Sequence, residues 1–470
     1  MQRRWQVLTL VSVATFVASL DLFIVNIAFP DIRAEFGGAS VGALSWVLNA
    51  YAIVFAALLV PAGRLADRTG RKRGFLTGLA LFSLGSALCG AAPSVVTLVA
   101  ARVLQAAGAA LLVPTSLALL LPEFEPRERP AAIGIWAGVG AAAAAAGPPL
   151  GGLLVQLDWR LVFLVNLPVG AWALWRAATL LIETRDVSDQ GRPDWLGTAL
   201  LAASVGALTL GFVQAPDWGW ADPRTLAALM GAVAGLALFA WRCAHHPSPV
   251  VDPAMLRVRS FAMANVAAIL FSAAFGAMLL SNVLFMTGVW QESILRAGLQ
   301  LAPGPALAAL TAVTSSRLTN RVGQSRLAAL GCLLFATGIT IVALRAGTTP
   351  DYASELLPGL IFTGIGVGFV LPSLNSAAAA SLPPARFATG AAVVTMSRQL
   401  GIALGVAILV AVLGTPAPGA LLAAFQDGWT FQIAAALAGA AAALAIGVAG
   451  PVVSPAPVVP RGTAAGTQPG

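Results

Sequence analysis

Residues 63–73 read GRLADRTGRKR, and residues 316–326, much further along the chain, read SRLTNRVGQSR. Aligned without a gap, the two stretches share three arginines, a leucine and a glycine: Arg64 and Arg317, Leu65 and Leu318, Arg68 and Arg321, Gly70 and Gly323, Arg73 and Arg326. They differ at Asp67, which becomes Asn320 in the second copy. Such a match between two distant basic loops indicates an internal repeat, so the chain is predicted to contain two related halves.

The composition is that of a membrane protein. Of the 470 residues, 58% are hydrophobic and only 10% are charged, and the mean hydropathy is +0.86. Soluble domains carry about 25% charged residues. The net charge of +8 could suggest nucleic-acid binding, but the basic residues lie in short loops between apolar runs, where their sign is a topology signal. We therefore expect no nucleic-acid partner.

Fourteen apolar runs follow one another along the chain, and each is a candidate membrane helix. They lie near residues 7–30, 42–62, 75–92, 95–121, 131–156, 161–182, 195–214, 224–242, 261–290, 299–316, 327–345, 354–376, 390–413 and 429–450. The repeated loop follows the second run and again the second of the last six runs. We predict an all-α polytopic membrane protein with two six-helix halves, residues 1–190 and 256–450, and two inserted transmembrane helices, residues 191–255. Parallel halves with a site between them form one major class of secondary transporter. The tail, residues 451–470, is rich in Pro, Gly, Ala and Thr and is expected to be disordered.

The distribution of basic residues predicts the orientation. If the N-terminus is cytoplasmic, twenty of the 27 Lys and Arg residues lie on the cytoplasmic side, five lie on the opposite side and two lie within the membrane. By the positive-inside rule, both termini are expected to be cytoplasmic. Met1 to Gln6 is a short basic start, and no cleavable signal is expected.

Asp21 interrupts the first apolar run, residues 7–30, which reads VLTLVSVATFVASLDLFIVNIAFP. A carboxylate at this depth costs roughly 2.5 to 3.5 kcal/mol, so Asp21 must be protonated, paired or facing water. Arg102 and Gln105 share a helix face, and Asp21 is the only carboxylate within the predicted membrane core that could pair with Arg102. Asp21 could gain and lose a proton during function, or the residues could form a neutral or static tie between helices.

The loop at residues 63–73 has two interpretations. Its basic residues alone satisfy a positive-inside anchor. The repeat favours a further role as a gate latch, in which Asp67 pairs with an arginine in one closed state and releases it in another. Glycines at both ends allow a tight turn and close helix approach. The residues of this candidate gating loop are Gly63, Arg64, Asp67, Arg68, Gly70, Arg71 and Arg73.

The fifth apolar run is rich in small residues and proline. Glycines let helices approach closely, and prolines remove backbone hydrogen bonds and bend a helix. A bent, tightly packed helix is therefore expected, with the motif residues Gly138, Gly147, Pro148, Gly151 and Gly152. Similar close contacts are expected in the second half at Gly364, Gly366, Gly368, Gly401 and Gly405.

Together these motifs resemble the major facilitator superfamily, and within it the fourteen-span drug:proton antiporters of the EmrB/QacA type, over residues 6–450. The resemblance rests on linked motifs in the right order: Asp21 with Asn26 and Pro30, Trp46 and Tyr51 with the loop at 63–73, Arg102 with Gln105 and Gly108, Gly147 to Gly152, and Trp159 to Pro168. It implies a proton-driven exporter that works by alternating access, with Arg102 implicated in proton coupling. It also implies that the fifth-run motif marks an exporter and that the chain lies in a bacterial cytoplasmic membrane.

Amphipathic organic compounds, such as drugs or antibiotics, are the expected substrates. The expected contacts are Asn26, Trp46, Asn49, Tyr51, Gln105, Asn375 and Arg398. Arg398 could instead extend its charged end to the cytoplasmic face. The alternative functions are a proton symporter that imports a small organic nutrient anion, with Arg102 or Arg398 as counter-ion, and a membrane sensor that binds a ligand without moving it.

Neither enzymatic nor metal chemistry is expected. The HExxH and GxxxxGK[ST] motifs do not occur, so the sequence gives no support for a zinc protease or for direct coupling to ATP. Cys89, Cys243 and Cys332 lie far apart in or beside apolar runs and are interpreted as packing residues. We expect a monomer without a cofactor, whose partners are a small organic substrate, protons and the lipid bilayer, with the proton gradient as energy source.

Overall fold

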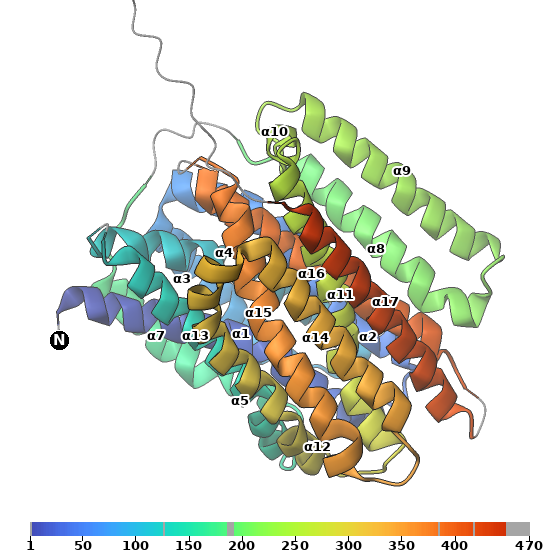
Figure 1. Ribbon diagram of the computed structural model, residues 1–470. Coiled ribbons are helices and arrows are strands. Elements are labelled where there is room, and N and C mark those ends of the chain that lie inside the picture. The colour runs from blue at the N-terminus through green and yellow to red at the C-terminus, as the bar shows by residue number, and fades with distance from the viewer. Residues whose placement is uncertain (1, 126, 186–191, 384–385, 417–418, 448–470) are drawn as a thin grey trace, which may run out of the picture.

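The computed structural model describes residues 2–125, 127–185, 192–383, 386–416 and 419–447, and these ranges are mostly helical (Figure 1). They contain no strand. The predicted disordered tail, residues 451–470, lies outside them. In chain order the helices are α1 (Arg3–Glu35), α2 (Val41–Thr69), α3 (Arg71–Gly90), α4 (Val95–Leu120), the 3₁₀ turn η1 (Leu121–Glu123), α5 (Arg129–Val155), α6 (Leu161–Leu164), α7 (Asn166–Leu180), α8 (Trp195–Trp218), α9 (Pro223–His245), α10 (Pro253–Leu256), α11 (Arg259–Gly288), α12 (Ile294–Leu301), α13 (Pro303–Val322), α14 (Gln324–Arg345), the π-turn η2 (Tyr352–Leu356), α15 (Leu357–Ala380), α16 (Phe387–Leu413) and α17 (Leu421–Ala445).

Thirteen described helical segments are long and apolar enough to cross a membrane. The predicted run at residues 299–316 is the one that differs. It does not form one helix, because α12 ends at Leu301 and α13 begins at Pro303, a residue that starts helices well since it lacks a backbone N–H. The second half of α13 is polar, with the sequence TSSRLTNRV, and this helix is not among the thirteen.

The two predicted halves pack as two helical groups. In the first, α3 lies against α4, α1 against α5 and α2 against α4; in the second, α14 lies against α15, and α11 against α16 and α17. A glycine pair allows close approach in each group. A Cβ on Gly108 of α4 would lie 2.7 Å from the backbone oxygen of Gly78 on α3, and one on Gly366 of α15 would lie 2.5 Å from that of Gly331 on α14. The internal repeat is therefore visible in the packing as well as in the sequence.

The repeated loops share their turn geometry. Gly70 joins α2 to α3 with a φ of 128°, and Gly323 joins α13 to α14 with a φ of 90°. Glycine adopts such positive φ angles without the steric cost that a Cβ brings. The side chains of Arg317 and Asn320, named in the sequence comparison, lie outside those that the structure describes.

The close contacts predicted from the glycines of the second half are present. A Cβ built at any of these glycines would come within 2.5 Å of a backbone oxygen on a neighbouring helix, as found for Gly364, Gly366, Gly368, Gly401 and Gly405. Helix α15 therefore meets both α13 and α14 at backbone contact distance, and α16 meets α11 in the same way. Any side chain larger than hydrogen at these positions would force the helices apart.

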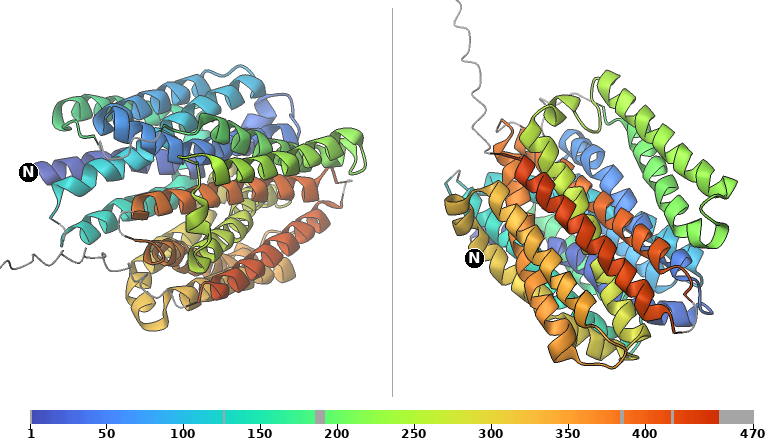
Figure 2. Two further views of the ribbon diagram at one scale, coloured as in Figure 1. Left: turned by 90° about the horizontal axis from the view of Figure 1, so that it is seen from above. Right: turned by 45° about the vertical axis from the view of Figure 1, so that its right-hand side comes forward.

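Several helix contacts join the groups, and a hairpin flanks them. Helix α2 packs against α16, while α5 packs against α12 and α13. Helices α8 and α9 form a hairpin on the outside of the bundle, where α8 contacts α2 and α16 (Figure 2). Asp194 caps α8 through the Gly197 N–H at 2.9 Å and pairs with Arg242 of α9 at 2.7 Å. Burial alone would raise the pKa of Asp194, but the hydrogen bonds from Arg242 and Gly197 hold that pKa below its ordinary value.

Candidate functional site

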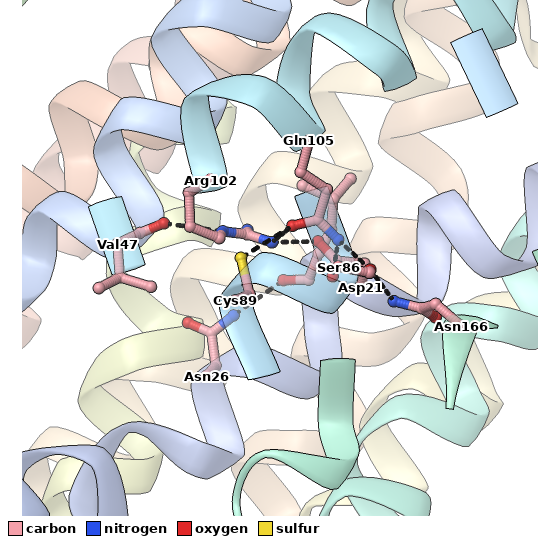
Figure 3. A network of polar contacts seen from close by, with 9 residues as sticks. Asp21, Asn26, Val47, Ser86, Cys89, Arg102, Gln105 and Asn166 are labelled. Atoms are coloured by element: carbon pink, nitrogen blue, oxygen red, sulfur yellow. Dashed lines mark hydrogen bonds and ion pairs between the residues drawn. The ribbon is translucent and has the colours of Figure 1, made fainter. Parts of the chain in front are cut away.

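Three polar side chains meet inside the first helical group, where α1 contacts α4 (Figure 3). Asp21 of α1 forms an ion pair with Arg102 of α4. The second oxygen of Asp21, Oδ1, accepts a hydrogen bond from Nε2 of Gln105 at 2.8 Å. Nη1 of Arg102 also donates to Oε1 of Gln105 at 2.6 Å. The pairing of Asp21 with Arg102 expected from the sequence is therefore present, and Gln105 binds both partners.

The rest of the Arg102 guanidinium is occupied as well. Its Nε donates to the backbone oxygen of Val47 at 3.1 Å. Its Cζ lies 4.1 Å from the ring centroid of Tyr51 and 5.8 Å from that of Phe163, within the range of cation–π attraction. The charge of Arg102 is thus compensated by a carboxylate, two further oxygens and two aromatic rings, as a charge at full burial requires.

Two residues that the sequence analysis did not assign to the site extend this network. Nε2 of Gln105 donates to Oγ of Ser86 on α3 at 2.8 Å, and Nδ2 of Asn166 on α7 donates to the same oxygen at 3.0 Å. Cys89, interpreted as a packing residue, is buried, and its Sγ lies 3.8 Å from Oε1 of Gln105. Asn166 lies in the motif Trp159 to Pro168 quoted for the resemblance, whereas the signal at Ser86 was its spacing of one helical turn from Cys89 in an apolar stretch.

The network is closed to solvent. The exposed fraction is 0% for Asp21 and Gln105 and 1% for Arg102. Asp21 can therefore exchange a proton with water only if the surrounding helices move. The ion pair seen here is consistent with both interpretations from the sequence. In one, the helices move and Asp21 gains and loses a proton; in the other, the pair is a permanent tie between helices.

The loop at residues 63–73 is docked on the segment that follows α7. Nε of Arg71 lies 2.7 Å from Oδ1 of Asp67, so Asp67 forms its ion pair within the loop. Glu183 binds the N-terminal end of α3. Its two carboxylate oxygens accept hydrogen bonds from the backbone N–H groups of Lys72 at 3.0 Å and Arg73 at 3.2 Å. A carboxylate suits this place because the first N–H groups of a helix lack partners within it. The sequence analysis did not identify Glu183.

Gly70 and Arg64 hold the loop from two sides. A Cβ on Gly70 would lie 2.5 Å from Cδ of Glu183, so a larger residue would displace the docked carboxylate. Arg64 donates from Nη1 to the backbone oxygens of Ser248 at 3.1 Å and Pro249 at 2.8 Å, in the segment after α9. The loop therefore connects the first helical group to the α8–α9 hairpin. Of the other assigned residues, Gly63 lies against Pro114, while Arg68 and Arg73 are exposed.

Two motif glycines of α5 fit closely against α1. A Cβ on Gly147 would lie 2.7 Å from Cβ of Phe23, and one on Gly151 would lie 3.0 Å from Cγ1 of Ile24. Because the nearest atoms belong to the inner parts of these side chains, there is little room for a methyl group. The tight packing predicted for the fifth run is therefore present on this side of the helix.

The same helix meets the second group near its C-terminal end. A Cβ on Gly152 would lie 3.1 Å from Cα of Leu295 on α12, and one on Gly298 of α12 would lie 2.5 Å from the backbone oxygen of Pro148. Gly138, nearer the start of α5, is exposed, and a Cβ there would meet nothing within 4 Å. The groups are therefore in contact at one end of α5, while the helix is open at Gly138.

The residues predicted to contact a substrate differ in their surroundings. Tyr51 and Gln105 are fully buried in the Asp21–Arg102 network. Asn26 is also buried and donates to the backbone oxygen of Leu22 at 2.9 Å. Asn49 has 0% exposure, and its Oδ1 has no hydrogen-bond partner. None of these four side chains presents much surface to a ligand in this conformation.

The other three predicted contacts are more accessible. Trp46 is half-buried against the core of the bundle, and Asn375 is exposed. Arg398, near the middle of α16, is half-buried, yet its Nε is shielded from solvent and has no hydrogen-bond partner. Arg398 forms no ion pair with any residue that the structure describes. It is therefore an uncompensated cation within a membrane helix.

One motif match missed by the sequence analysis has a structural explanation. Residues 38–42 read GASVG, which fits the GxSxG pattern of serine hydrolases. That motif requires a strand followed by a helix, whereas Ser40 follows α1 and caps α2 by accepting the Ala43 N–H at 3.0 Å. Within the described ranges, no group of three or more His, Cys, Asp or Glu side chains could hold a metal ion.

Comparisons with known proteins agree with this architecture. The sequence pattern of the Major Facilitator Superfamily matches residues 11–406. The chain is 34% identical over 417 residues to the multidrug resistance protein Stp of Mycobacterium tuberculosis, covering 87% of this chain and 76% of that protein. It is 32% identical to the tetracenomycin C resistance and export protein of Streptomyces glaucescens (87% and 75%), and 34% identical to the puromycin resistance protein of Streptomyces alboniger (91% and 84%).

Solved transporter structures share the fold. A crystal structure of a peptide transporter in complex with sulfate superposes with a TM-score of 0.69 at 19% identity, covering 93% of each chain. A nucleoside transporter superposes with a TM-score of 0.65 at 14% identity, covering 95% of this chain and 100% of that one. At such identities the likeness concerns the fold alone.

Proposed function

The chain belongs to the Major Facilitator Superfamily, and on this premise we propose that it is a proton-coupled exporter of amphipathic organic compounds such as drugs or antibiotics. The family makes it a multi-pass membrane transporter with a small-molecule substrate. Relatives named for multidrug resistance or for resistance to and export of an antibiotic support export and this class of compound.

The observation that carries the proposal is the buried ion pair of Asp21 and Arg102. Protonation of Asp21 would remove the charge that holds Arg102 and Gln105, so binding a proton and keeping the ion pair exclude each other. Release of Arg102 would in turn free its contacts with Val47 and Tyr51 on α2. A proton on Asp21 would therefore loosen α1, α2 and α4 from one another, which is how protonation could drive a change of conformation.

The proton gradient is sufficient as the energy source. One proton moving inward supplies about 1.4 kcal/mol per pH unit. It supplies a further amount of about 2.3 kcal/mol per 100 mV of membrane potential. A single proton could thus sustain at least about a tenfold gradient of a neutral substrate. No cofactor is required in this mechanism.

The contacts of α5 support alternating access. The helix touches α12 through Gly152 and Pro148, while Gly138 faces open space. With both termini cytoplasmic, the α5–α12 contact would lie on the extracellular side and Gly138 in the cytoplasmic half of α5. Export would require the α5–α12 contact to separate while the cytoplasmic end closes.

The loop at 63–73 is proposed to act as a latch during that closure. Its Asp67–Arg71 ion pair and the docked Glu183 hold the ends of α2, α3 and α7 together. Asp67→Asn should slow transport at unchanged protein level. An unchanged rate would leave the loop with only its anchoring role.

The finer organisation is part of the same proposal. It comprises fourteen membrane spans of the EmrB/QacA type, divided into residues 1–190, 191–255 and 256–450, and a monomer in the bacterial cytoplasmic membrane with both termini inside. Protons and lipid are its other partners. A terminal tag that an impermeant reagent reaches from outside the cell would overturn this orientation.

The proposal is tested by resistance and by flux. The chain is expressed in a bacterium that lacks its own pumps, and growth is measured across a panel of drugs, dyes and antibiotics. The wild type should confer resistance, Asp21→Asn should not, and the exposed control Asp427→Asn on α17 should behave as wild type. In vesicles, a proton symporter that imports would accumulate substrate in the opposite direction for the same pH gradient. Full resistance with Asp21→Asn would contradict the coupling role.

A further inference from the structure

Arg398 occupies a part of α16 where no protein group balances its charge. It lies near the middle of the helix Phe387–Leu413 and is half-buried. Its Nε is shielded from solvent without a hydrogen-bond partner, and no ion pair or hydrogen bond joins Arg398 to any residue that the structure describes. A cation at membrane depth is unfavourable unless it meets an anion, a carbonyl or water. A partner from outside the chain would remove this penalty.

The helices packed on α16 do not offer a carboxylate at this depth. They are α2, α8, α11, α15 and α17. Helices α11 and α15 contain no acidic residue. The acidic residues of the other three, Asp67, Asp217 and Asp427, lie toward helix ends, and Asp67 is already paired with Arg71. Movement of the neighbouring helices therefore cannot easily supply the missing anion.

A polar group next to Arg398 also lacks a partner. Gln399, the next residue, is 4% exposed, and its Oε1 has no hydrogen-bond partner. By contrast, Ser397 is satisfied by a 2.8 Å hydrogen bond to Asn265 of α11, which fixes the rotation of α16 at this turn. Arg398 and Gln399 are thus held at a defined turn of α16 beside its contact with α11.

We infer that Arg398 binds an anionic or strongly accepting oxygen of the transported compound, such as a carboxylate, phenolate or enolate. The preferred substrates are therefore amphipathic organic acids rather than organic cations. This inference rests on the proposed export function and specifies its substrate class. The five N–H donors of a guanidinium suit such an oxygen, and a pair of them can bind a carboxylate side by side.

Exchange of an anion for a proton has a consequence for energy coupling. Outward movement of an organic anion and inward movement of a proton both carry charge in the same sense. Export of an anion should therefore respond to the membrane potential about twice as strongly as export of a neutral compound with the same proton count. Export of a monovalent cation for one proton would not respond to it at all.

The test uses two xanthene dyes of similar size, anionic fluorescein and cationic rhodamine 6G. Binding to the purified full chain is measured by fluorescence polarisation, without any gradient. Wild type should bind fluorescein at least tenfold more tightly than rhodamine 6G. Arg398→Gln should lose at least tenfold in fluorescein affinity with rhodamine affinity unchanged or improved, and Arg398→Lys should keep part of the preference. The control Arg386→Gln removes an arginine of the same segment, which pairs with Asp252 at 2.9 Å, and should bind as wild type.

The outcomes separate this inference from the proposed function. A wild type without preference for the anion, or an unchanged preference in a folded Arg398→Gln protein, overturns the role of Arg398. Flux of the same dyes is then measured in vesicles with an imposed pH gradient. Anion preference without gradient-driven flux supports the Arg398 site and rejects proton-coupled export. Gradient-driven flux of both dyes at equal rates supports export and rejects the assignment of Arg398.

Discussion

The two arginines within the membrane helices, Arg102 and Arg398, have opposite surroundings. Arg102 is 1% exposed and is bound by Asp21, Gln105, the Val47 carbonyl and the Tyr51 ring. Arg398 has none of these partners among the residues that the structure describes. The first helical group therefore contains its own counter-charge, whereas the second contains a cation that no described residue balances. Two groups built on one repeat have thus become different in charge while remaining similar in packing.

This difference bears on how work is divided between the groups. A balanced, buried pair can bind a proton only by breaking its ion pair, which suits a group that couples protonation to movement. An unbalanced cation gains most from an incoming anion, which suits a group that recognises a ligand. The proposed proton coupling therefore belongs to the first group, and the proposed recognition of substrate charge to the second.

The largest expected effect is on stability, where the two arginines should differ most. Arg102→Gln should destabilise the protein by about 3 to 5 kcal/mol, because it leaves the Asp21 carboxylate buried without its cation. Arg398→Gln should change stability by about 1 kcal/mol or less, because no partner is lost. Unfolding in the same detergent measures both. Equal losses in the two variants would remove the distinction between the sites.

A double-mutant cycle sharpens the same comparison within the first group. Asp21→Asn and Arg102→Gln should each be destabilising, but the double variant should be more stable than the sum of the single losses predicts, by up to about 3 kcal/mol. The physical reason is that the double variant leaves no unpaired charge. The double variant should still fail to export. Additive losses would mean that Asp21 and Arg102 stabilise the protein independently.

A smaller difference in stability is expected between substitutions in the packed part of α5 and in its open part. Gly147→Ala should cost about 1 to 3 kcal/mol because its methyl group would overlap Phe23. Gly138→Ala on the same helix should be neutral, or stabilising by up to about 1 kcal/mol, because nothing lies within 4 Å and alanine favours helix. Thermal unfolding of the two variants checks this. A loss for Gly138→Ala as large as that for Gly147→Ala would contradict the open position of Gly138.

The smallest expected difference in stability is between removing Ser86, in the network of Asp21 and Arg102, and removing Ser397, beside Arg398. Ser86 receives hydrogen bonds from both Gln105 and Asn166, whereas Ser397 makes one with Asn265. Ser86→Ala should therefore cost about 2 kcal/mol and Ser397→Ala about 1 kcal/mol. Ser86→Ala should also alter the pH dependence of export, since it loosens Gln105 against Asp21. The reverse order of losses would show that the first network does not depend on Ser86.

Much of this architecture could be predicted from the sequence, because membrane burial leaves few options. The pairing of Asp21 with Arg102 could be predicted because Asp21 is the only carboxylate within the predicted membrane core. The close helix contacts could be predicted from the glycines. Ser86 and Asn166 were missed because a single small polar residue in a membrane helix often bonds only to its own backbone. Glu183 was missed because its partners are backbone N–H groups, which leave no pattern in the side chains.

Other features could not be derived from the sequence because they depend on where a helix breaks or on how distant helices pack. The break between α12 and α13 reflects Pro303 acting as a helix start, which the hydropathy of the run conceals. The isolation of Arg398 required the positions of all the carboxylates around α16. The full burial of Tyr51 and Gln105, expected from sequence to face a ligand, results from the network that occupies them.

Proton movement through Asp21 is tested most directly by counting protons in vesicles that contain the purified protein, with a substrate identified in the resistance panel. Wild type should take up protons as substrate leaves against its gradient. Asp21→Asn should still exchange labelled substrate across the membrane at equilibrium, yet neither move protons nor respond to a pH gradient. Proton-driven accumulation by Asp21→Asn at the wild-type rate would contradict the account.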